Sequence, residues 1–333
     1  MPVSFEISIV LALFMSTCLG WSAVVPSRPW YFEQVSPRTL DRETEGATDS
    51  PVPFGFFVLP SLPNSACDSV RYQQVFVASE FADLPQSGMY LYALTLRPDA
   101  CANGGNAGSL IDNFVIRLST TSGHPDGLST AFAENVGADQ TEVYKKPLVE
   151  VGSSGVCIPG FPPVPVSWDQ NQYILDVPFP YSPAKGNLLI DITFSGKERF
   201  VGGARMDTQS LTNDGVSRVY GCPSSIQTAQ AADTTGIAAR FLFVLPQLTI
   251  QDSGPNLLLA WSRRLTSFRL EWSDSVVPSA VWRTFTGPIE RFGSEISRIE
   301  IPKTAATEAR YYRLFSPPTA PTPASLPQSQ NLP

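Results

Sequence analysis

Short runs in which apolar and polar residues alternate constrain this chain more than any other feature of its sequence. Phe114, Ile116 and Leu118 occupy alternate positions, and residues 188–194 and 268–273 repeat the pattern. A period of two places alternate side chains on the same face of a β-strand. Turn sequences rich in Gly, Pro and Asn separate the runs, and amphipathic helical stretches are nearly absent. The pattern predicts an all-β chain.

The strands are expected to form two successive bodies. Residues 67–246 contain many short strands bounded by Gly and Pro turns, which predicts a jelly-roll-like β-sandwich. Residues 247–316 hold about six or seven strands, which predicts a small immunoglobulin- or fibronectin-like β-sandwich. Residues 23–66 are rich in Pro, Ser and charge, so we expect a poorly ordered lead-in or an irregular first strand. Residues 317–333 predict a Pro-rich disordered tail.

Residues 7–19, close to the N-terminus, form an apolar block. Its length suits a secretory signal peptide, which we place at residues 1–22, and is short for a spanning helix. Glu6 and the lack of a basic residue before the block depart from the usual signal pattern, and a buried strand or helix is the alternative. No other apolar run is long enough to span a membrane. We expect a secreted or cell-envelope protein that is not an integral membrane protein.

Four cysteines follow the predicted signal peptide: Cys67, Cys101, Cys157 and Cys222. An even number of cysteines in an exported chain predicts disulfide bonds, and four cysteines allow three connectivities. Proximity in sequence favours the pairs Cys67–Cys101 and Cys157–Cys222. The closely spaced cysteine pairs that zinc sites require are absent. The alternative to disulfide bonds is that the cysteines are buried free thiols.

Charge and histidine content exclude several classes of function. The chain has 23 basic and 30 acidic residues, a formal net charge of −7, so it lacks the positive balance that nucleic-acid binding requires. Its one histidine, His124, lies in a Gly-His-Pro-Asp-Gly sequence. A general base beside Asp126 is one interpretation, but no nucleophile motif accompanies it, and the sequence favours a surface turn.

Acidic residues offer two further hypotheses. Glycoside hydrolysis needs two carboxylates placed across a sugar bond, and the candidates are Glu80, Asp83, Asp112, Glu134 and Asp139. Calcium takes carboxylate and carbonyl oxygens, and the candidate donors are Asp112–Asn113, Glu134–Asn135, Asp139 and Asn213–Asp214. Neither set has a recognised spacing, so we expect solvated loops and no cofactor, with one structural Ca²⁺ left open.

Aromatic residues offer a binding hypothesis. Trp168, Tyr173 and Tyr181, with Phe179, lie close together in a Pro-rich segment and are candidates for a platform on which a sugar ring stacks. Core packing is the alternative for this group. Three tryptophans of the second body are expected to fill its core: Trp261, Trp272 and Trp282. The arginines of that body, including Arg263 and Arg264, offer contacts to an anionic surface, or else a solvated strand face.

Residues 71–100 and 111–144 resemble segments of exported all-β proteins from Verrucomicrobia and related bacteria. Residues 248–314, which end in Tyr-Tyr-Arg-Leu, are similar to a small β-sandwich module at the C-termini of exported proteins in the same bacteria. The resemblance implies a jelly-roll-like domain, a C-terminal sandwich and an extracellular or envelope location. It implies no reaction and no catalytic residue. The chain lacks the C-terminal sorting signal of that group, so we expect a released or loosely associated protein.

These observations favour a non-enzymatic protein of binding or adhesion, with a glycan or an envelope component as its partner. Export, the all-β pattern and the absence of a catalytic motif support this hypothesis. Two alternatives stay open at this point: a carbohydrate-active hydrolase that uses paired carboxylates, and a purely structural envelope protein without a ligand.

Overall fold

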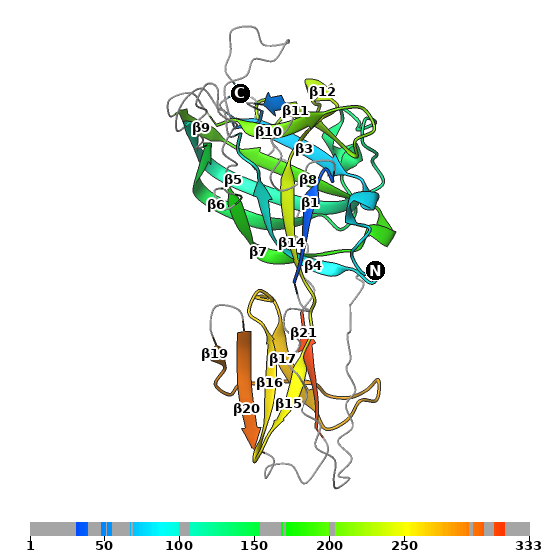
Figure 1. Cartoon of the computed structure of the whole chain (residues 1–333), viewed down its shortest axis with the longest axis vertical. Coiled ribbons are helices and arrows are strands. Elements are labelled where there is room, and N and C mark those ends of the chain that lie inside the picture. The colour runs from blue at the N-terminus through cyan, green and yellow to red at the C-terminus, as the bar shows by residue number, and fades with distance from the viewer. Residues whose placement is uncertain are drawn as a thin grey trace, which may run out of the picture. The chain divides into compact units, whose positions relative to one another are not determined.

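The structure is a computed structural model that describes residues 31–38, 48–50, 52–54, 67, 69–99, 107–153, 168, 171–199, 204–292, 296–302 and 310–316. Strands dominate these residues, with three short 3₁₀ turns: η1 (Ala78–Phe81), η2 (Phe132–Asn135) and η3 (Pro183–Lys185). The all-β sandwich fold is therefore confirmed (Figure 1). No helix in the described ranges is long and apolar enough to cross a membrane. The predicted signal peptide (1–22) and tail (317–333) lie outside the described residues.

The chain divides into two compact units. Among the described residues, the larger unit comprises those between 24 and 246 together with 262–266, and the smaller unit comprises 247–261 and those from 267 onwards. Each unit has its own sheets and its own buried side chains, so we describe each by itself.

Three antiparallel sheets build the larger unit. The first has the order β1 (Tyr31–Ser36), β14 (Ala239–Val244), β4 (Met89–Leu96), β7 (Gln172–Tyr181). The second has the order β13 (Thr235–Ile237), β10 (Met206–Ser210), β2 (Thr48–Ser50). The third has the order β12 (Ala231–Asp233), β11 (Val216–Gly221), β3 (Val70–Phe76), β8 (Asn187–Phe194), β5 (Ala107–Thr121), β6 (Thr141–Ser153), and β9 (Gly196–Arg199) also pairs with β5.

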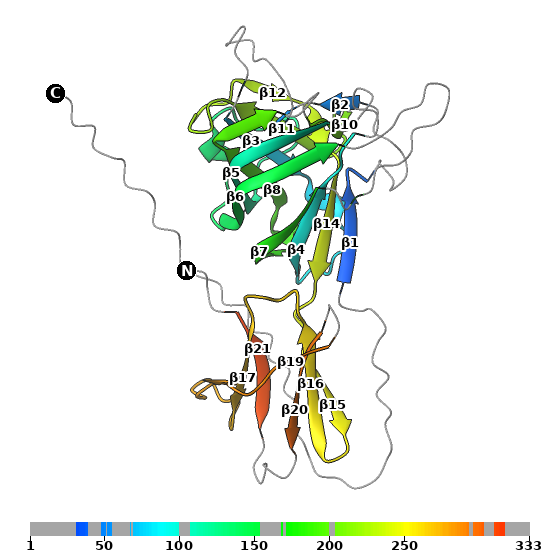
Figure 2. The same ribbon diagram turned by 90° about the vertical axis from the view of Figure 1, so that its left-hand side faces the viewer.

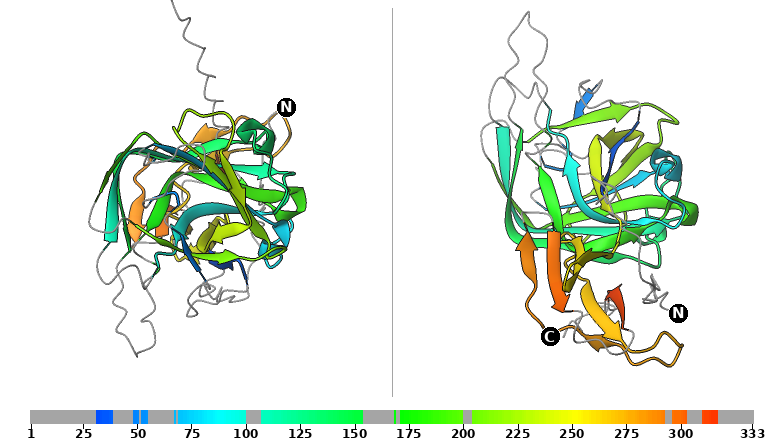
Figure 3. Two further views of the ribbon diagram at one scale, coloured as in Figure 1. Left: turned by 90° about the horizontal axis from the view of Figure 1, so that it is seen from above. Right: turned by 60° about the horizontal axis from the view of Figure 1, so that its bottom comes forward.

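Successive strands of this unit cross between the two main layers. The chain passes from β3 in the third sheet to β4 in the first and back to β5, and from β6 to β7 to β8 in the same way. Figure 2 shows these strands in two layers, and Figure 3 shows them curving around the core. Repeated crossing between facing sheets is the jelly-roll-like arrangement that the sequence predicted.

Aromatic rings from both layers fill the core of the larger unit. Phe76 of β3 meets Phe241 of β14 edge-on, with ring centroids 4.9 Å apart. Phe81, at the end of η1, contacts both Phe241 and Tyr181, with ring centroids 5.2 and 5.0 Å apart. All four rings are fully buried. Burial of large rings provides much of the free energy that holds two sheets together.

The segment before residue 67 belongs in part to this sandwich. β1 pairs along its whole length with β14, from Tyr31 opposite Val244 to Ser36 opposite Ala239. β2 pairs with β10. The larger unit therefore begins before residue 67, where the sequence predicted its start. Of the two interpretations of residues 23–66, a first strand agrees with β1, and a poorly ordered lead-in does not.

A disulfide joins Cys67 to Cys222, which are 155 residues apart in sequence. The predicted pairs Cys67–Cys101 and Cys157–Cys222 are therefore wrong, because each of them uses one of these two cysteines. Proximity in sequence misled the prediction, since β3 and β11 are neighbours in the third sheet and bring Cys67 and Cys222 together. Cys101 and Cys157 lie outside the described residues.

The smaller unit consists of two facing sheets. The four-stranded sheet has the order β15 (Thr249–Ser253), β16 (Asn256–Ser262), β20 (Ile296–Pro302), β19 (Glu290–Phe292). The three-stranded sheet has the order β18 (Arg283–Thr284), β17 (Arg269–Ser273), β21 (Tyr311–Phe315). With β18 counted as strand C′, the order β15-β16-β20-β19 corresponds to the A-B-E-D order of immunoglobulin-like sandwiches. Residues from both sheets are buried between them: Leu259, Trp261, Leu270, Ile299, Tyr312 and Leu314.

The disulfide gives the first testable prediction. The chain between Cys67 and Cys222 is 155 residues long, so the cross-link lowers the entropy of the unfolded chain by an amount worth about 5 kcal/mol. We expect Cys67→Ser with Cys222→Ser to lower the melting temperature clearly in thermal unfolding. Peptide mapping without reductant should show Cys67 linked to Cys222. Linkage of Cys67 to any other cysteine would contradict the structure.

The aromatic core gives the second prediction. Phe241→Ala removes a ring that contacts both layers, so we expect it to lower the free energy of unfolding by about 3–5 kcal/mol. Ile174→Ala is the control, because Ile174 lies on β7 of the same sheet but is 50% exposed. Urea unfolding measures both variants. Equal losses for the two would show that Phe241 does not join the layers.

Candidate functional site

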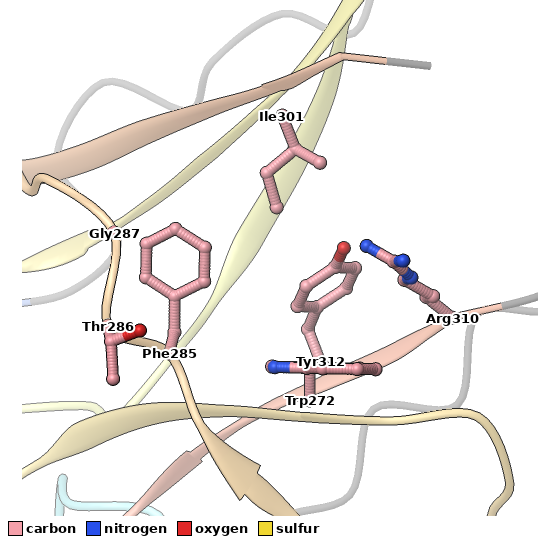
Figure 4. A pocket seen from close by; sticks show the side chains of 7 residues that line it. All are labelled: Trp272, Phe285, Thr286, Gly287, Ile301, Arg310 and Tyr312. Atoms are coloured by element: carbon pink, nitrogen blue, oxygen red, sulfur yellow. The ribbon is translucent and has the colours of Figure 1, made fainter. Parts of the chain in front are cut away.

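A pocket of about 180 Å³ lies in the smaller unit. Trp272 of β17 and Tyr312 of β21 form part of its wall and lie directly opposite each other in register, so both project from the same face of the three-stranded sheet. Ile301 of β20 reaches the pocket from the facing sheet. The pocket therefore opens between the two layers of the sandwich (Figure 4).

The segment after β18 forms the opposite wall. The Phe285 N–H donates a hydrogen bond to the Leu270 carbonyl at 2.9 Å, which holds this segment beside β17. Phe285, Thr286 and Gly287 line the pocket, and Thr286 is exposed, so the pocket is open to solvent on this side. A Cβ at Gly287 would lie 2.5 Å from the Phe285 ring, so glycine leaves the ring its position.

Arg310 supplies the charge of the pocket. Its guanidinium carbon lies 4.9 Å from the centroid of the Trp272 ring, and Figure 4 shows the guanidinium group beside the Tyr312 hydroxyl. Burial raises the pKa of the Tyr312 hydroxyl above its usual value, and the nearby positive charge of Arg310 offsets part of that effect. The Tyr312 hydroxyl is therefore neutral at pH 7 and available as a hydrogen-bond donor or acceptor.

Arg310 differs from its neighbours because no carboxylate of the described residues forms an ion pair with it. Arg283, whose guanidinium also lies over Trp272 at 4.8 Å, is paired with Asp274 at 3.2 Å. Trp272 is half-buried between its sheet neighbours and these two arginines. The pocket thus combines apolar walls with a cation that has no carboxylate partner in the part of the chain that the structure describes.

The other face of the three-stranded sheet is closed by its own side chains. Glu271 is only 3% exposed and pairs with Arg313 at 3.0 Å and Arg269 at 2.8 Å. The Trp282 ring lies 4.2 Å from the Arg313 guanidinium carbon, so Trp282 packs on this outer face. The prediction that Trp282 fills the core is therefore wrong. The prediction holds for Trp261, which is buried.

The three ligand-binding candidates from the Pro-rich segment do not form an exposed platform. Tyr173 and Tyr181 are buried in the core of the larger unit, as is Phe179. Trp168 is also buried and packs against Ala238, with the Arg97 and Arg240 guanidinium groups over its ring. A sugar stacks only on a ring face that solvent reaches, so the predicted platform is wrong and core packing describes these residues.

The polar side chains on the outer face of the third sheet of the larger unit are paired with one another. Arg71 donates two hydrogen bonds to Asp191, at 2.8 and 3.3 Å, and Gln73 donates to the same carboxylate at 2.9 Å. Arg117 pairs with Glu142 at 3.2 Å. Asp191 alternates with Ile190 and Ile192 of the core and so lies on the outer face of β8, but η2 and its flanking residues cover it, as the buried Phe132 beneath Arg71 shows.

Most of the acidic candidates are held by hydrogen bonds or ion pairs to groups of the protein itself, whereas Asp112 lies on β5. Glu80 accepts hydrogen bonds from Ser36 and Arg38, Asp83 pairs with Arg38, and Asp139 accepts from the Thr120 N–H. Glu134 accepts from Ser129, Asp112 is exposed, and Asp214 accepts from the Leu211 and Val216 N–H groups. Within the described ranges, no three acidic, histidine or cysteine side chains are arranged to hold a metal ion.

The remaining calcium and general-base candidates are Asn113 on β5, Asn135 in η2, and His124 and Asn213 at turns. Asn113 donates to Ser195 at 2.6 Å and the buried Asn135 donates to Gln73 at 3.0 Å. His124 is exposed, and its carbonyl accepts a hydrogen bond from the Gly127 N–H at 3.1 Å, as the predicted surface turn requires. Asn213 has a positive φ of 62°, which suits a turn.

No protein-family model matches the chain, and no curated protein is significantly similar to it in sequence. The function therefore has to be argued from geometry, and the pocket at Arg310 is the site that sequence reasoning missed. The arginines of the second body already suggested contacts to an anionic group. The alternation of residues along a strand, however, does not show which arginine has no carboxylate partner.

Glu80 gives a prediction about pH. Burial raises its pKa above the usual 4.5, and the negative charge of Asp214 adds to this, while Ser36 and Arg38 act against it. A raised pKa means that the folded state binds this proton more tightly than the unfolded chain, so the free energy of unfolding falls as pH rises above about 4.5.

We therefore expect Glu80→Gln to reduce the fall in unfolding free energy between pH 4.5 and neutral pH. Asp83→Asn is the control, because it removes a carboxylate that is exposed and also contacts Arg38. Urea unfolding across this pH range is the measurement. Parallel curves for Glu80→Gln and the unmodified protein would show that Glu80 contributes nothing to the pH dependence.

Proposed function

We propose that this is an exported, non-enzymatic binding protein whose smaller sandwich holds a sugar residue of a glycan. The pocket at Phe285, Ile301, Tyr312 and Arg310 is the observation that carries the proposal. Its volume is below the roughly 300–1,000 Å³ of sites for drug-sized ligands, so it suits a single ring of a longer chain. Ring faces supply apolar contact to the C–H face of a sugar, and the Arg310, Tyr312 and Thr286 side chains supply hydrogen bonds to its hydroxyls.

Export is part of the proposal. The disulfide Cys67–Cys222 supports it, because disulfides persist in oxidising compartments outside the cytosol. The apolar block at residues 7–19 supports it independently. The partner would then be a glycan or another component of the cell envelope or its surroundings.

A binding role suits the pocket better than glycoside hydrolysis does. Hydrolysis needs two carboxyl groups about 5–10 Å apart, on either side of the scissile bond. The described residues that line the pocket are aromatic, aliphatic, hydroxyl-bearing and basic, with no carboxylate among them. The paired-carboxylate hydrolase and the ligand-free envelope protein remain the outcomes against which the proposal is tested.

The test begins with an array of neutral and acidic glycans, followed by titration calorimetry with the best ligand. Phe285→Ala removes one aromatic wall, and loss of a ring contact worth about 1.4 kcal/mol corresponds to a tenfold weaker dissociation constant. Ile289→Ala is the matched control, because Ile289 belongs to the same unit but is 47% exposed and does not line the pocket.

We expect Phe285→Ala to weaken binding about tenfold and Ile289→Ala to leave it unchanged, with both variants unfolding at similar temperatures. Hydrolysis of the glycan during the titration would favour the enzymatic alternative. Binding to no glycan on the array would contradict the proposed function.

A further inference from the structure

We infer that Arg310 makes this pocket selective for an acidic sugar, a uronic acid residue whose carboxylate it binds, over the neutral form of the same sugar. The inference rests on the proposed function and names the ligand class of the same site. It follows from the ion pairs that the arginines of the smaller unit form and from the position of Arg310, which forms none among the described residues.

Most other arginines on this unit's strands have carboxylate partners within the protein, and Arg291 of β19, which has none among the described residues, is exposed. Arg283 pairs with Asp274, Arg298 with Glu290, and Arg313 with Glu271. Arg310 has no such partner among the described residues, although it is half-buried. A guanidinium group pairs favourably with a carboxylate through two parallel hydrogen bonds, so a carboxylate from a ligand would complete the pattern that its neighbours already show.

The surroundings of Arg310 strengthen that interaction. The guanidinium group lies against the Trp272 ring and beside Tyr312, which is buried, so it is partly shielded from water. Charged hydrogen bonds are stronger where water is partly excluded. Asp274, the acidic residue that also acts on the Tyr312 pKa, forms its ion pair with Arg283 rather than with Arg310.

The rest of the pocket fits the remainder of a uronic acid. Phe285 and Ile301 form apolar surface opposite Arg310, as Figure 4 shows, and Thr286 offers a hydroxyl group at the exposed side. A uronic acid carries its carboxylate at one end of a ring whose faces are partly apolar. The same arrangement would leave a neutral sugar without a group to pair with the cation, so selectivity comes from Arg310 rather than from the walls.

The experiment compares galacturonate, glucuronate and mannuronate trimers with the same trimers after reduction of their carboxylates to alcohols. Titration calorimetry measures each with the unmodified protein, Arg310→Gln and Arg283→Gln. Arg283→Gln is the matched control, because it removes the same charge at the same distance from the Trp272 ring but does not line the pocket. Thermal unfolding checks that both variants fold.

We expect at least one uronate trimer to bind about tenfold or more tightly than its reduced form. Arg310→Gln should abolish that difference, and Arg283→Gln should keep it. Equal binding of the acidic and reduced forms, or equal losses in the two variants, would overturn the inference while leaving the proposed function standing. Binding of neither form of any trimer would overturn the inference, and together with an empty glycan array it would overturn the proposed function too.

Discussion

Burial of alternate side chains between facing β-layers is the constraint on which this structure depends. In the larger unit the rings of Phe76, Phe81, Tyr181 and Phe241 meet between the sheets, and the same burial takes Tyr173 out of reach of any ligand. A sandwich of this kind uses its aromatic residues to join the layers. Binding therefore falls to side chains at the open ends and edges of the sandwich.

Ion pairs within the protein further reduce the number of side chains that are available to bind a ligand. Ion pairs occupy the polar side chains on two sheet faces that would otherwise offer contacts to a ligand. They join Arg71 to Asp191 on the larger unit and Arg313 to Glu271 on the smaller unit. Such pairs stabilise a surface or a covered face but leave little unmet potential for a ligand. Arg310 stands apart because its charge faces a pocket and has no carboxylate partner among the described residues. An unmet charge beside an apolar wall is a more specific indication of a ligand than an aromatic-rich sequence.

The sequence could predict the all-β fold because strand period and turn chemistry are local properties. It could also predict His124 as a turn residue, and Trp261 as core. It could not predict the Cys67–Cys222 pair, since that depends on which strands become neighbours across 155 residues. It could not show that Trp168 is covered or that Glu271 is buried on an outward face, because alternation gives the side of a strand and not what lies over it. The sequence could not predict the pocket either, because its walls come from strands that are separate in the chain.

Hydrogen exchange followed by mass spectrometry, with and without a bound glycan, tests most directly whether the smaller sandwich holds the ligand. Slower exchange is expected in peptides that cover the pocket residues 285–287, Arg310 and Tyr312, with the larger unit unchanged. Protection on the strands of the larger unit, with none around the pocket, would place the ligand elsewhere and contradict the account.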